Sequence, residues 1–157
     1  KGVIAPSVMQ PMYNLVKRQA EVELFPLAQD AGIGVMVYNP LGGGVLTGKY
    51  DSAGAGSGRL AESEMYRRRY PEPWMFTAAE GLKALAAETG LSPVSLAVAW
   101  AARHPAVTCP IIGARSVEQV EPALQAPEIG MPDELYERLR ALAPSPPPAT
   151  DRTDDVR

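Results

Sequence analysis

The sequence predicts an α/β protein built on a parallel sheet. Three short apolar stretches, at residues 8–13, 33–38 and 107–112, are rich in β-favouring side chains and have the length of strands. Helical patterns lie between these stretches, and strands that alternate with helices pair in parallel through right-handed crossovers. Hydrophobic residues make up 46% of the 157-residue chain and charged residues 21%, which is typical of one packed domain.

The first helical pattern follows the first predicted strand, at residues 16–31. Its apolar residues recur at steps of three and four, and Gly32 then ends the pattern. The predicted strand at 33–38 follows directly. Together these segments form one strand-helix-strand unit.

Capping residues mark the next helix. Thr77 and Glu80 form a capping box, in which each side chain meets a free backbone N–H, and Gly90 ends the helix that they open. We therefore expect a helix from about residue 77 to residue 89.

A further helix begins at Ser92 and Pro93. Serine caps the helix, and proline at the first helical position loses no needed hydrogen bond. This helix is expected to end near Arg103, because Pro105 biases the residue before it away from helical geometry.

Two helices follow the third predicted strand. Ser116 opens the first of them in another capping box, and this helix runs to about Gln125. The second is amphipathic and is marked by Leu135, Leu139 and Leu142. Residues 144–157 are rich in proline and charge, so we expect a disordered tail after a domain of residues 1–143.

A parallel sheet of three strands is incomplete. Three strands cannot close a barrel, and an open parallel sheet leaves two unpaired edges and apolar faces that need cover. We therefore expect further strands upstream of residue 1.

Charge and cysteine usage narrow the partners and the compartment. The net charge of −3, from 15 basic and 18 acidic residues, gives no positive field for nucleic acid. Cys109 is the sole cysteine, which excludes an intrachain disulfide and favours a reducing cytoplasm. The sequence has neither a signal-peptide pattern nor an apolar run of membrane length, so we expect a soluble protein with no membrane partner. No metal site is predicted.

One segment carries a resemblance to a known family. Residues 38–50, Tyr-Asn-Pro-Leu-Gly-Gly-Gly-Val-Leu-Thr-Gly-Lys-Tyr, resemble a signature of the aldo-keto reductases, which are (β/α)8-barrel oxidoreductases that use NADPH. The resemblance extends through residues 10–14, 21–23 and 111–119 and covers residues 3–142. It implies that the three strands are similar to strands six to eight of a TIM barrel, so the chain would be the C-terminal part of that fold.

The glycine loop is the first candidate for cofactor binding. In such barrels the loops after strands seven and eight often hold phosphate. Three adjacent glycines, Gly42, Gly43 and Gly44, let the backbone approach an anion and aim N–H groups at it. The resemblance implies that they hold a diphosphate together with Leu41 and Asn39. From the glycines alone, a plain strand-exit turn is the alternative.

Two side chains at strand ends are candidates for the nicotinamide. Tyr38 offers an aromatic face, and Gln10 offers an amide donor and acceptor for the carboxamide. The resemblance implies both roles. The residues alone also allow a core tyrosine and a buried glutamine that is satisfied by neighbouring backbone.

Basic side chains are candidates for the cofactor phosphates. Arg115 follows Gly113 and precedes a capped helix, so its guanidinium and the helix N-terminus converge on one point. We assign it to the 2′-phosphate of NADP, with a solvated arginine as the alternative. Lys49 and Arg59 resemble a basic pair that lies over the cofactor phosphates in some branches of the family.

The adenosine end departs from the family pattern. Gln119 resembles a position that helps to hold the adenosine. The family commonly has Glu and Asn three and four residues further on, where this sequence has Pro122 and Ala123. Weaker adenine contacts are therefore predicted.

Residues 51–74 show no clear periodicity and predict a long loop. Long loops in compact domains are usually functional, so this one is expected to cover the cofactor or to line a substrate pocket. The run of three arginines at 67–69 is interpreted as a solvated surface.

No residue of this chain is a catalytic candidate. Carbonyl reduction needs a proton donor, and the resemblance places an Asp-Tyr-Lys-His group on early strands that this sequence lacks. His104 precedes the third predicted strand, at the barrel end opposite the chemistry, and is expected to cap or lie at the surface. Cys109 is expected to be a small buried hydrophobic residue.

Two functions follow from these residues. In the leading hypothesis, the chain is part of an NADPH-dependent aldo-keto reductase and reduces aldehydes or ketones only when the missing half is supplied. In the rival hypothesis, it is a non-catalytic half-barrel module that pairs with itself or with a partner through its exposed edges. The expected partners are a dinucleotide, a small carbonyl substrate, and either a second copy or a complementing N-terminal half.

Overall fold

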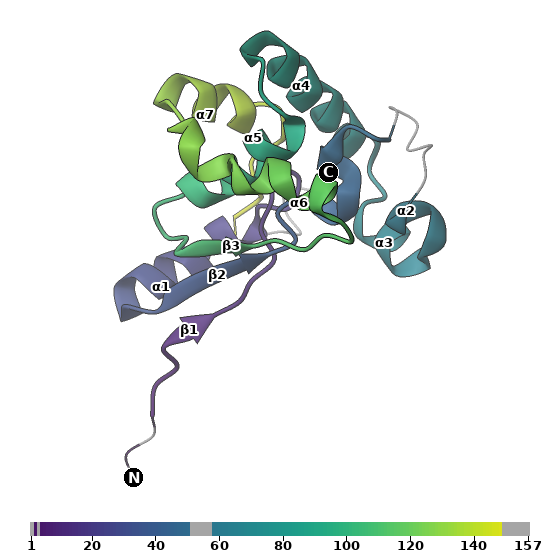
Figure 1. The fold of residues 1–157 in the computed structure, drawn as a ribbon. Helices are drawn as coiled ribbons and strands as arrows, with labels where there is room; N and C mark the ends of the chain where they lie inside the picture. The colour runs from purple at the N-terminus through teal and green to yellow at the C-terminus, as the bar shows by residue number, and fades with distance from the viewer. Residues whose placement is uncertain (1, 3, 51–57, 149–157) are drawn as a thin grey trace.

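A computed structural model describes residues 2, 4–50 and 58–148. Three strands form a parallel sheet in the order β1-β2-β3, which confirms the α/β class (Figure 1). The strands are β1 (Val8–Met9), β2 (Gly34–Tyr38) and β3 (Cys109–Ile111). The first strand is shorter than predicted, because the chain beyond Met9 keeps only one isolated bridge to β2, between Met12 and Tyr38.

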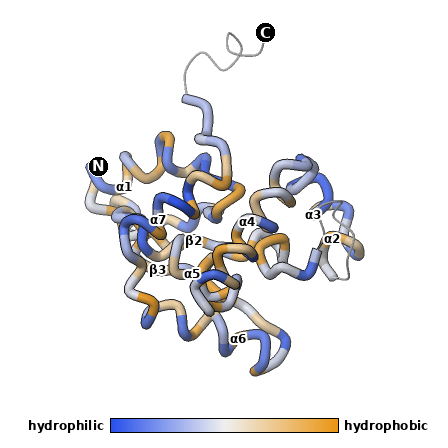
Figure 2. Tube along the Cα trace, turned by 90° about the horizontal axis from the view of Figure 1, so that it is seen from above, coloured by the Kyte–Doolittle hydropathy of each residue, from blue (hydrophilic) through white to orange (hydrophobic). Residues whose placement is uncertain are grey.

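Helices cover one side of the sheet and extend beyond it. The α-helices are α1 (Leu24–Ala31), α2 (Arg59–Glu62), α3 (Glu64–Arg69), α4 (Pro73–Thr89), α5 (Pro93–Arg103), α6 (Val117–Leu124) and α7 (Asp133–Arg140). Short 3-10 helices are η1 (Gln19–Glu21), η2 (Gly42–Thr47) and η3 (Ala126–Ile129). Figures 1 and 2 show α2 and α3 together at one side of the molecule, apart from α1 and α7.

Several predicted helix boundaries are confirmed. Gly32 and Gly90 follow α1 and α4 in the left-handed conformation, with φ of 65° and 71°. Ser92 accepts a hydrogen bond from the Val94 N–H at 3.2 Å and caps α5. The helix ends at Arg103, as predicted, and the next residue is extended.

Other predictions were wrong. The helix expected at 16–31 begins only at Leu24, after the short η1 turn. The helix expected to open at Thr77 begins four residues earlier, at Pro73, and the Thr77 hydroxyl instead bonds the Pro73 carbonyl at 3.5 Å. Much of the long loop expected at 51–74 is helical, since α2 and α3 lie within it; residues 51–57 lie outside the described part.

The core gathers aromatic rings around Trp100 of α5, which is fully buried. Its ring stacks on Tyr13 at 5.2 Å and on Tyr136 at 5.8 Å, and Tyr13 meets Phe25 edge-on at 4.8 Å. These contacts join the segment after β1 to α1, α5 and α7. The sheet is therefore packed on the face that these helices cover.

The two faces of the sheet differ in exposure. Val35 and Val37 of β2 are fully buried, whereas Met36 between them is only partly buried. On the neighbouring β3, Cys109 and Ile111 are exposed. The prediction of a buried Cys109 was wrong, because β3 is an edge strand within the described sheet and its open face has no cover.

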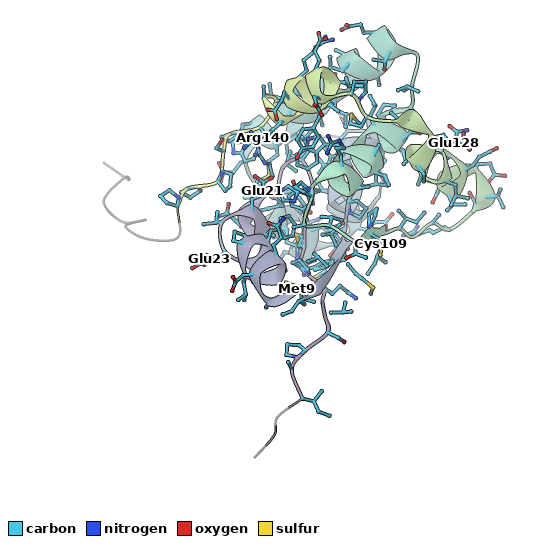
Figure 3. The ribbon with its side chains drawn as sticks, turned by 90° about the vertical axis from the view of Figure 1, so that its left-hand side faces the viewer. Met9, Glu21, Glu23, Cys109, Glu128 and Arg140 are labelled. Atoms are coloured by element: carbon cyan, nitrogen blue, oxygen red, sulfur yellow. The ribbon has the colours of Figure 1, made fainter. Side chains whose placement is uncertain are left out.

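A buried ion pair ties the segment after β1 to the C-terminal helix. The Arg18 guanidinium donates to Glu21 at 2.9 Å and to the Arg140 carbonyl at 3.3 Å, and the Tyr13 hydroxyl donates to Glu21 at 2.7 Å. Figure 3 labels Glu21 and Arg140 at this junction. The pairing satisfies an arginine that is only 4% exposed.

His104 lies at the turn before β3, where its Nδ1 accepts the Ala106 N–H at 3.2 Å. This contact confirms the predicted capping role. Burial lowers the pKa of His104, although the nearby Glu21 carboxylate acts in the opposite direction.

In the described part of the chain, no single helix is both long and apolar enough to cross a membrane. The α4 and α5 pair reaches the necessary length only across a bend of 103°. Residues 144–148 of the expected tail form neither helix nor strand, and residues 149–157 lie outside the described residues.

Candidate functional site

A groove of about 560 Å³ opens where β2 and β3 end. These strands are parallel neighbours, and Tyr38 pairs with Ile111, so the loops that follow them leave the same edge of the sheet. Both loops line the groove, and Gly43 and Arg115 lie on its wall as the dinucleotide hypothesis requires. Nine of the residues predicted from the sequence line it: Tyr38, Asn39, Leu41, Gly43, Gly44, Lys49, Gly113, Arg115 and Gln119.

The glycine loop has a backbone that other residues rarely adopt. Asn39, Gly42, Gly43 and Gly44 have φ of 62°, 58°, 66° and 103°. A Cβ at Gly43 would lie 2.5 Å from the Tyr66 ring, so this position needs glycine for space as well as for conformation. The loop is therefore compact, and its path brings the backbone of Gly43 and Gly44 to the groove wall.

The glycine N–H groups differ from the prediction. Those of Gly42 and Gly44 donate to the carbonyls of Asn39 and Leu41, at 3.0 and 2.9 Å. The Gly43 N–H donates to the Asn39 side-chain oxygen at 2.7 Å. All three donors are thus used inside the loop, because a tight turn satisfies its own backbone, and none is left to aim at an anion. Gly42 is buried and does not line the groove.

Of the two candidates for the nicotinamide, one lines the groove and the other does not. Tyr38 lies at the end of β2, is partly exposed and lines the groove, so it is not a core residue. Gln10 is exposed and does not line the groove, so the alternative of a buried glutamine was wrong, while its role toward the nicotinamide stays a prediction. The chain after Met9 stays beside β2, since the Tyr38 N–H donates to the Pro11 carbonyl at 3.0 Å and the Tyr13 N–H donates to the Tyr38 carbonyl at 3.3 Å.

Two basic side chains line the groove, and the N-terminus of α6 lies beside them. Lys49 is exposed, with its ammonium 5.1 Å from the centre of the Tyr50 ring. Arg115 is also exposed and lies 3.9 Å from the Glu62 carboxylate. Its backbone N–H donates to the Gln119 side chain at 3.1 Å. The N-cap of α6, Ser116, makes no side-chain cap hydrogen bond, and the Glu118 carboxylate lies in the first turn, where bonds from the Ser116 hydroxyl and the Glu118 backbone N–H lower its pKa.

Arg59 begins α2, but its side chain lies outside the described residues. Its predicted role over the cofactor phosphates therefore stays a prediction. Among the described residues, no group of three or more His, Cys, Asp or Glu side chains is placed to hold a metal ion.

Comparison with known proteins decides the family. The sequence model of the Aldo/keto reductase family matches residues 1–144 of this chain. The chain belongs to the aldo/keto reductase family. Members of this family fold as (β/α)8 barrels, and a parallel three-stranded sheet with its helices is consistent with part of one.

Curated relatives of this aldo/keto reductase chain include enzymes and channel subunits. It is 40% identical to human aldo-keto reductase family 7 member A3 over 148 residues, which cover 82% of the chain and 44% of that protein. It is 34% identical to an uncharacterized oxidoreductase of Bacillus subtilis, covering 87% of the chain and 40% of the relative. A probable voltage-gated potassium channel subunit beta of Oryza sativa is 32% identical, with 95% and 47% covered. The chain thus spans less than half the length of these relatives.

The departure from the aldo/keto reductase pattern on α6 has structural consequences. Pro122 lines the groove, and its carbonyl accepts a hydrogen bond from the buried Ser95 hydroxyl at 2.6 Å. Ala123 is 4% exposed and packs in the core. At these two positions α6 offers no side-chain amide or carboxylate to a ligand.

Two tyrosines near the groove of this aldo/keto reductase chain were not predicted from the sequence: Tyr66 in its wall and Tyr70 behind it. Tyr66 of α3 lies against Gly43 and lines the cavity. Tyr70, which follows α3, is 1% exposed and bonds Asn39 and Asn14 through its hydroxyl. The only signal was the pair of tyrosines within an arginine-rich run, and that run lacks helical periodicity. Neither His104 nor Cys109 lines the groove.

Proposed function

We propose that this chain is the cofactor-binding portion of an NADPH-dependent oxidoreductase that reduces aldehydes or ketones to alcohols. The observation that carries the proposal is the single groove at the ends of β2 and β3, lined by Tyr38, the glycine loop and Arg115. Family membership supports a nicotinamide cofactor. The proposal further assigns the three strands to positions six to eight of the barrel.

The groove suits an anionic dinucleotide with a flat ring at one end. Tyr38 offers an aromatic face at the strand end, beside the glycine loop. Lys49, Arg115 and the N-terminus of α6 supply positive charge for phosphates. Because the glycine N–H groups are already bonded, these groups carry the attraction to the diphosphate and to the 2′-phosphate.

Tyr38, Lys49 and Arg115 would hold a nicotinamide dinucleotide, which would supply hydride chemistry for the reduction of a carbonyl group. We assign to this chain the holding and orienting of the dinucleotide, and to other strands of the barrel the proton donor that an alkoxide needs. We propose that the donor comes from an N-terminal part of the barrel, either in the same polypeptide or in a complementing one. Relatives named as aflatoxin B1 aldehyde reductases, 39% identical in human, agree with an aldehyde substrate class. A cytoplasmic location is proposed from the sole, unpaired Cys109.

A non-catalytic binding or assembly module is the second candidate. The specific observation is the open sheet face with exposed Cys109 and Ile111, which a partner or a second copy would cover. Relatives named as probable potassium channel beta subunits fit such a module.

Titration of the chain with NADPH and NADH by calorimetry tests the first proposal. Arg115→Ala is expected to weaken NADPH by about fivefold, the order of one exposed charge-assisted bond, and NADH by less than about twofold. Equal weakening of both nucleotides would remove the 2′-phosphate assignment.

Complementation separates the two candidates. The chain is mixed with a polypeptide that contains the upstream strands of a family member, and NADPH-dependent carbonyl reduction is followed at 340 nm. The Cys109 thiol, exposed in this structure, provides a second readout, because closure of the barrel is expected to slow its labelling. Turnover with slower labelling supports the enzyme. Absence of NADPH binding in both samples, with stable self-association, supports the module.

A further inference from the structure

The Tyr70 hydroxyl joins three segments at the base of the groove. It accepts hydrogen bonds from the side-chain amides of Asn39 at 2.7 Å and Asn14 at 3.3 Å, and it lies 3.8 Å from the Met12 sulfur, to which it can donate. Asn39 directly follows β2, and Met12 and Asn14 follow β1. One oxygen therefore ties the segment after α3 to the ends of two neighbouring strands.

Asn39 depends on such partners, because it holds an unusual conformation. Among the described residues that are not glycine, it is the only one with positive φ, at 62°. The left-handed conformation is unfavourable for a residue with a Cβ, and asparagine offsets this by local hydrogen bonding. Its side-chain oxygen accepts the Gly43 N–H at 2.7 Å, and its carbonyl accepts the Asn14 amide at 3.0 Å.

The ring of Tyr70 supports the same loop by contact. Carbon atoms of the ring would lie 3.6 Å from a Cβ at Gly42 and 3.5 Å from one at Gly43, so the ring packs directly against the glycine backbone. Tyr70 is 1% exposed, and it does not line the groove. It supports the wall from behind and would not touch a ligand.

We propose that Tyr70 is a positioning residue of the groove: its hydroxyl orients the Asn39 amide, and Asn39 in turn fixes the Gly43 backbone in the shape that accepts the dinucleotide. The inference rests on the proposed function for its consequence in binding, and on the structure alone for its consequence in the loop. Burial raises the pKa of Tyr70 to about 12, so the hydroxyl keeps its proton throughout neutral pH.

Tyr70→Phe keeps the ring and removes the oxygen, which leaves the Asn39 Nδ2 without its bonded acceptor. The first measurement is hydrogen exchange of the Gly43 amide by NMR in the full chain. Loss of one buried hydrogen-bond partner is expected to speed this exchange by about tenfold. The second measurement is NADPH affinity, which is expected to fall by about tenfold through the same change.

Tyr13→Phe is the matched control. This substitution also removes the hydroxyl of a buried tyrosine that does not line the groove. The Tyr13 hydroxyl donates to Glu21 at 2.7 Å and not to the glycine loop. Tyr13→Phe is expected to lower thermal stability while leaving Gly43 exchange and NADPH affinity within about twofold of the original.

A double-mutant cycle with Asn39→Gly tests whether Tyr70 acts on Gly43 through the Asn39 amide. Glycine adopts the left-handed conformation without an orienting amide, so Tyr70→Phe in this background should change affinity by less than about twofold. The positioning role would be overturned if hydrogen exchange of the Gly43 amide were unchanged in Tyr70→Phe. It would also be overturned if the losses of NADPH affinity in the two single variants added fully in the double variant. If the original chain binds no NADPH, the proposed function fails, and Gly43 exchange alone decides the role of Tyr70.

Discussion

Gly43 and Gly113 both line the groove, yet alanine should be tolerated at only one of them. At Gly43, φ is 66°, and a residue with a Cβ loses about 1–2 kcal/mol in this region. The new Cβ would also lie 2.5 Å from the Tyr66 ring, which must move. Displacing a packed ring costs about 1–3 kcal/mol. The lower entropy of unfolded alanine recovers about 0.4–1 kcal/mol, which leaves a net loss of about 2 kcal/mol.

Gly113 provides the contrast within the same groove. Its φ lies outside the left-handed range, and a Cβ there meets no atom within 4 Å. Gly113→Ala should therefore be neutral, or stabilising by up to about 1 kcal/mol through the unfolded chain.

Thermal unfolding followed by circular dichroism measures both variants. For a chain of this size, about 2 kcal/mol corresponds to a fall in Tm of about 6 °C for Gly43→Ala. NADPH titration of the same samples should show weaker binding for Gly43→Ala only. An equal fall in Tm for both variants, or none for Gly43→Ala, would refute the reasoning from conformation and space.

Three further outcomes are expected. Ser92→Ala removes the cap of α5 and should lower the free energy of unfolding by about 1 kcal/mol in urea titrations; an unchanged midpoint would contradict the capping role. Burial opposes ionisation of Glu21, but hydrogen bonds from Arg18 and Tyr13 outweigh it and lower the pKa below 4.5. The lowered pKa of Glu21 stabilises the folded state above pH 4.5, and this contribution is lost as pH falls through the pKa of Glu21 in the folded protein. Glu21→Gln should therefore make the free energy of unfolding less dependent on pH below 4.5. NADPH affinity should fall as salt rises from 0.05 to about 0.5 M, since the basic side chains of the groove are exposed and screened; a flat salt profile would exclude their role.

Helix boundaries that depend on a few neighbouring residues could be predicted from the sequence. Gly32, Gly90 and Ser92 each act within one turn of the helix they bound, so their roles are visible without any tertiary contact. Thr77 shows the limit of this reasoning. Thr77 and Pro73 both provide a signal for the start of the helix. The helix begins at Pro73 because the added turn buries Met75 and Phe76 in the core.

The position of the groove could be predicted from the sequence, but its internal hydrogen bonds could not. Tyr38, Asn39 and Gly43 could be placed because a loop after a parallel strand must leave the sheet at its carboxyl edge. The hydrogen bonds inside the loop could not be placed, since Tyr70 reaches Asn39 across 31 residues and Asn14 across 56. The end of β1 could not be placed for the same reason: whether the strand continues past Met9 depends on packing, and the propensity of its residues does not decide it.

The order of the chain explains how binding can be separated from chemistry in this protein. Adjacent parallel strands bring their loops together whatever lies further along the sheet, so β2 and β3 suffice to build a groove from residues 38–122. Met36, Cys109 and Ile111 on the open sheet face are exposed or only partly buried among the described residues. On the proposed function, the dinucleotide is held by side chains that this chain already brings together, whereas the proton donor must come from elements that cover that open face. Binding of NADPH without turnover is therefore the behaviour that this architecture predicts for the chain by itself.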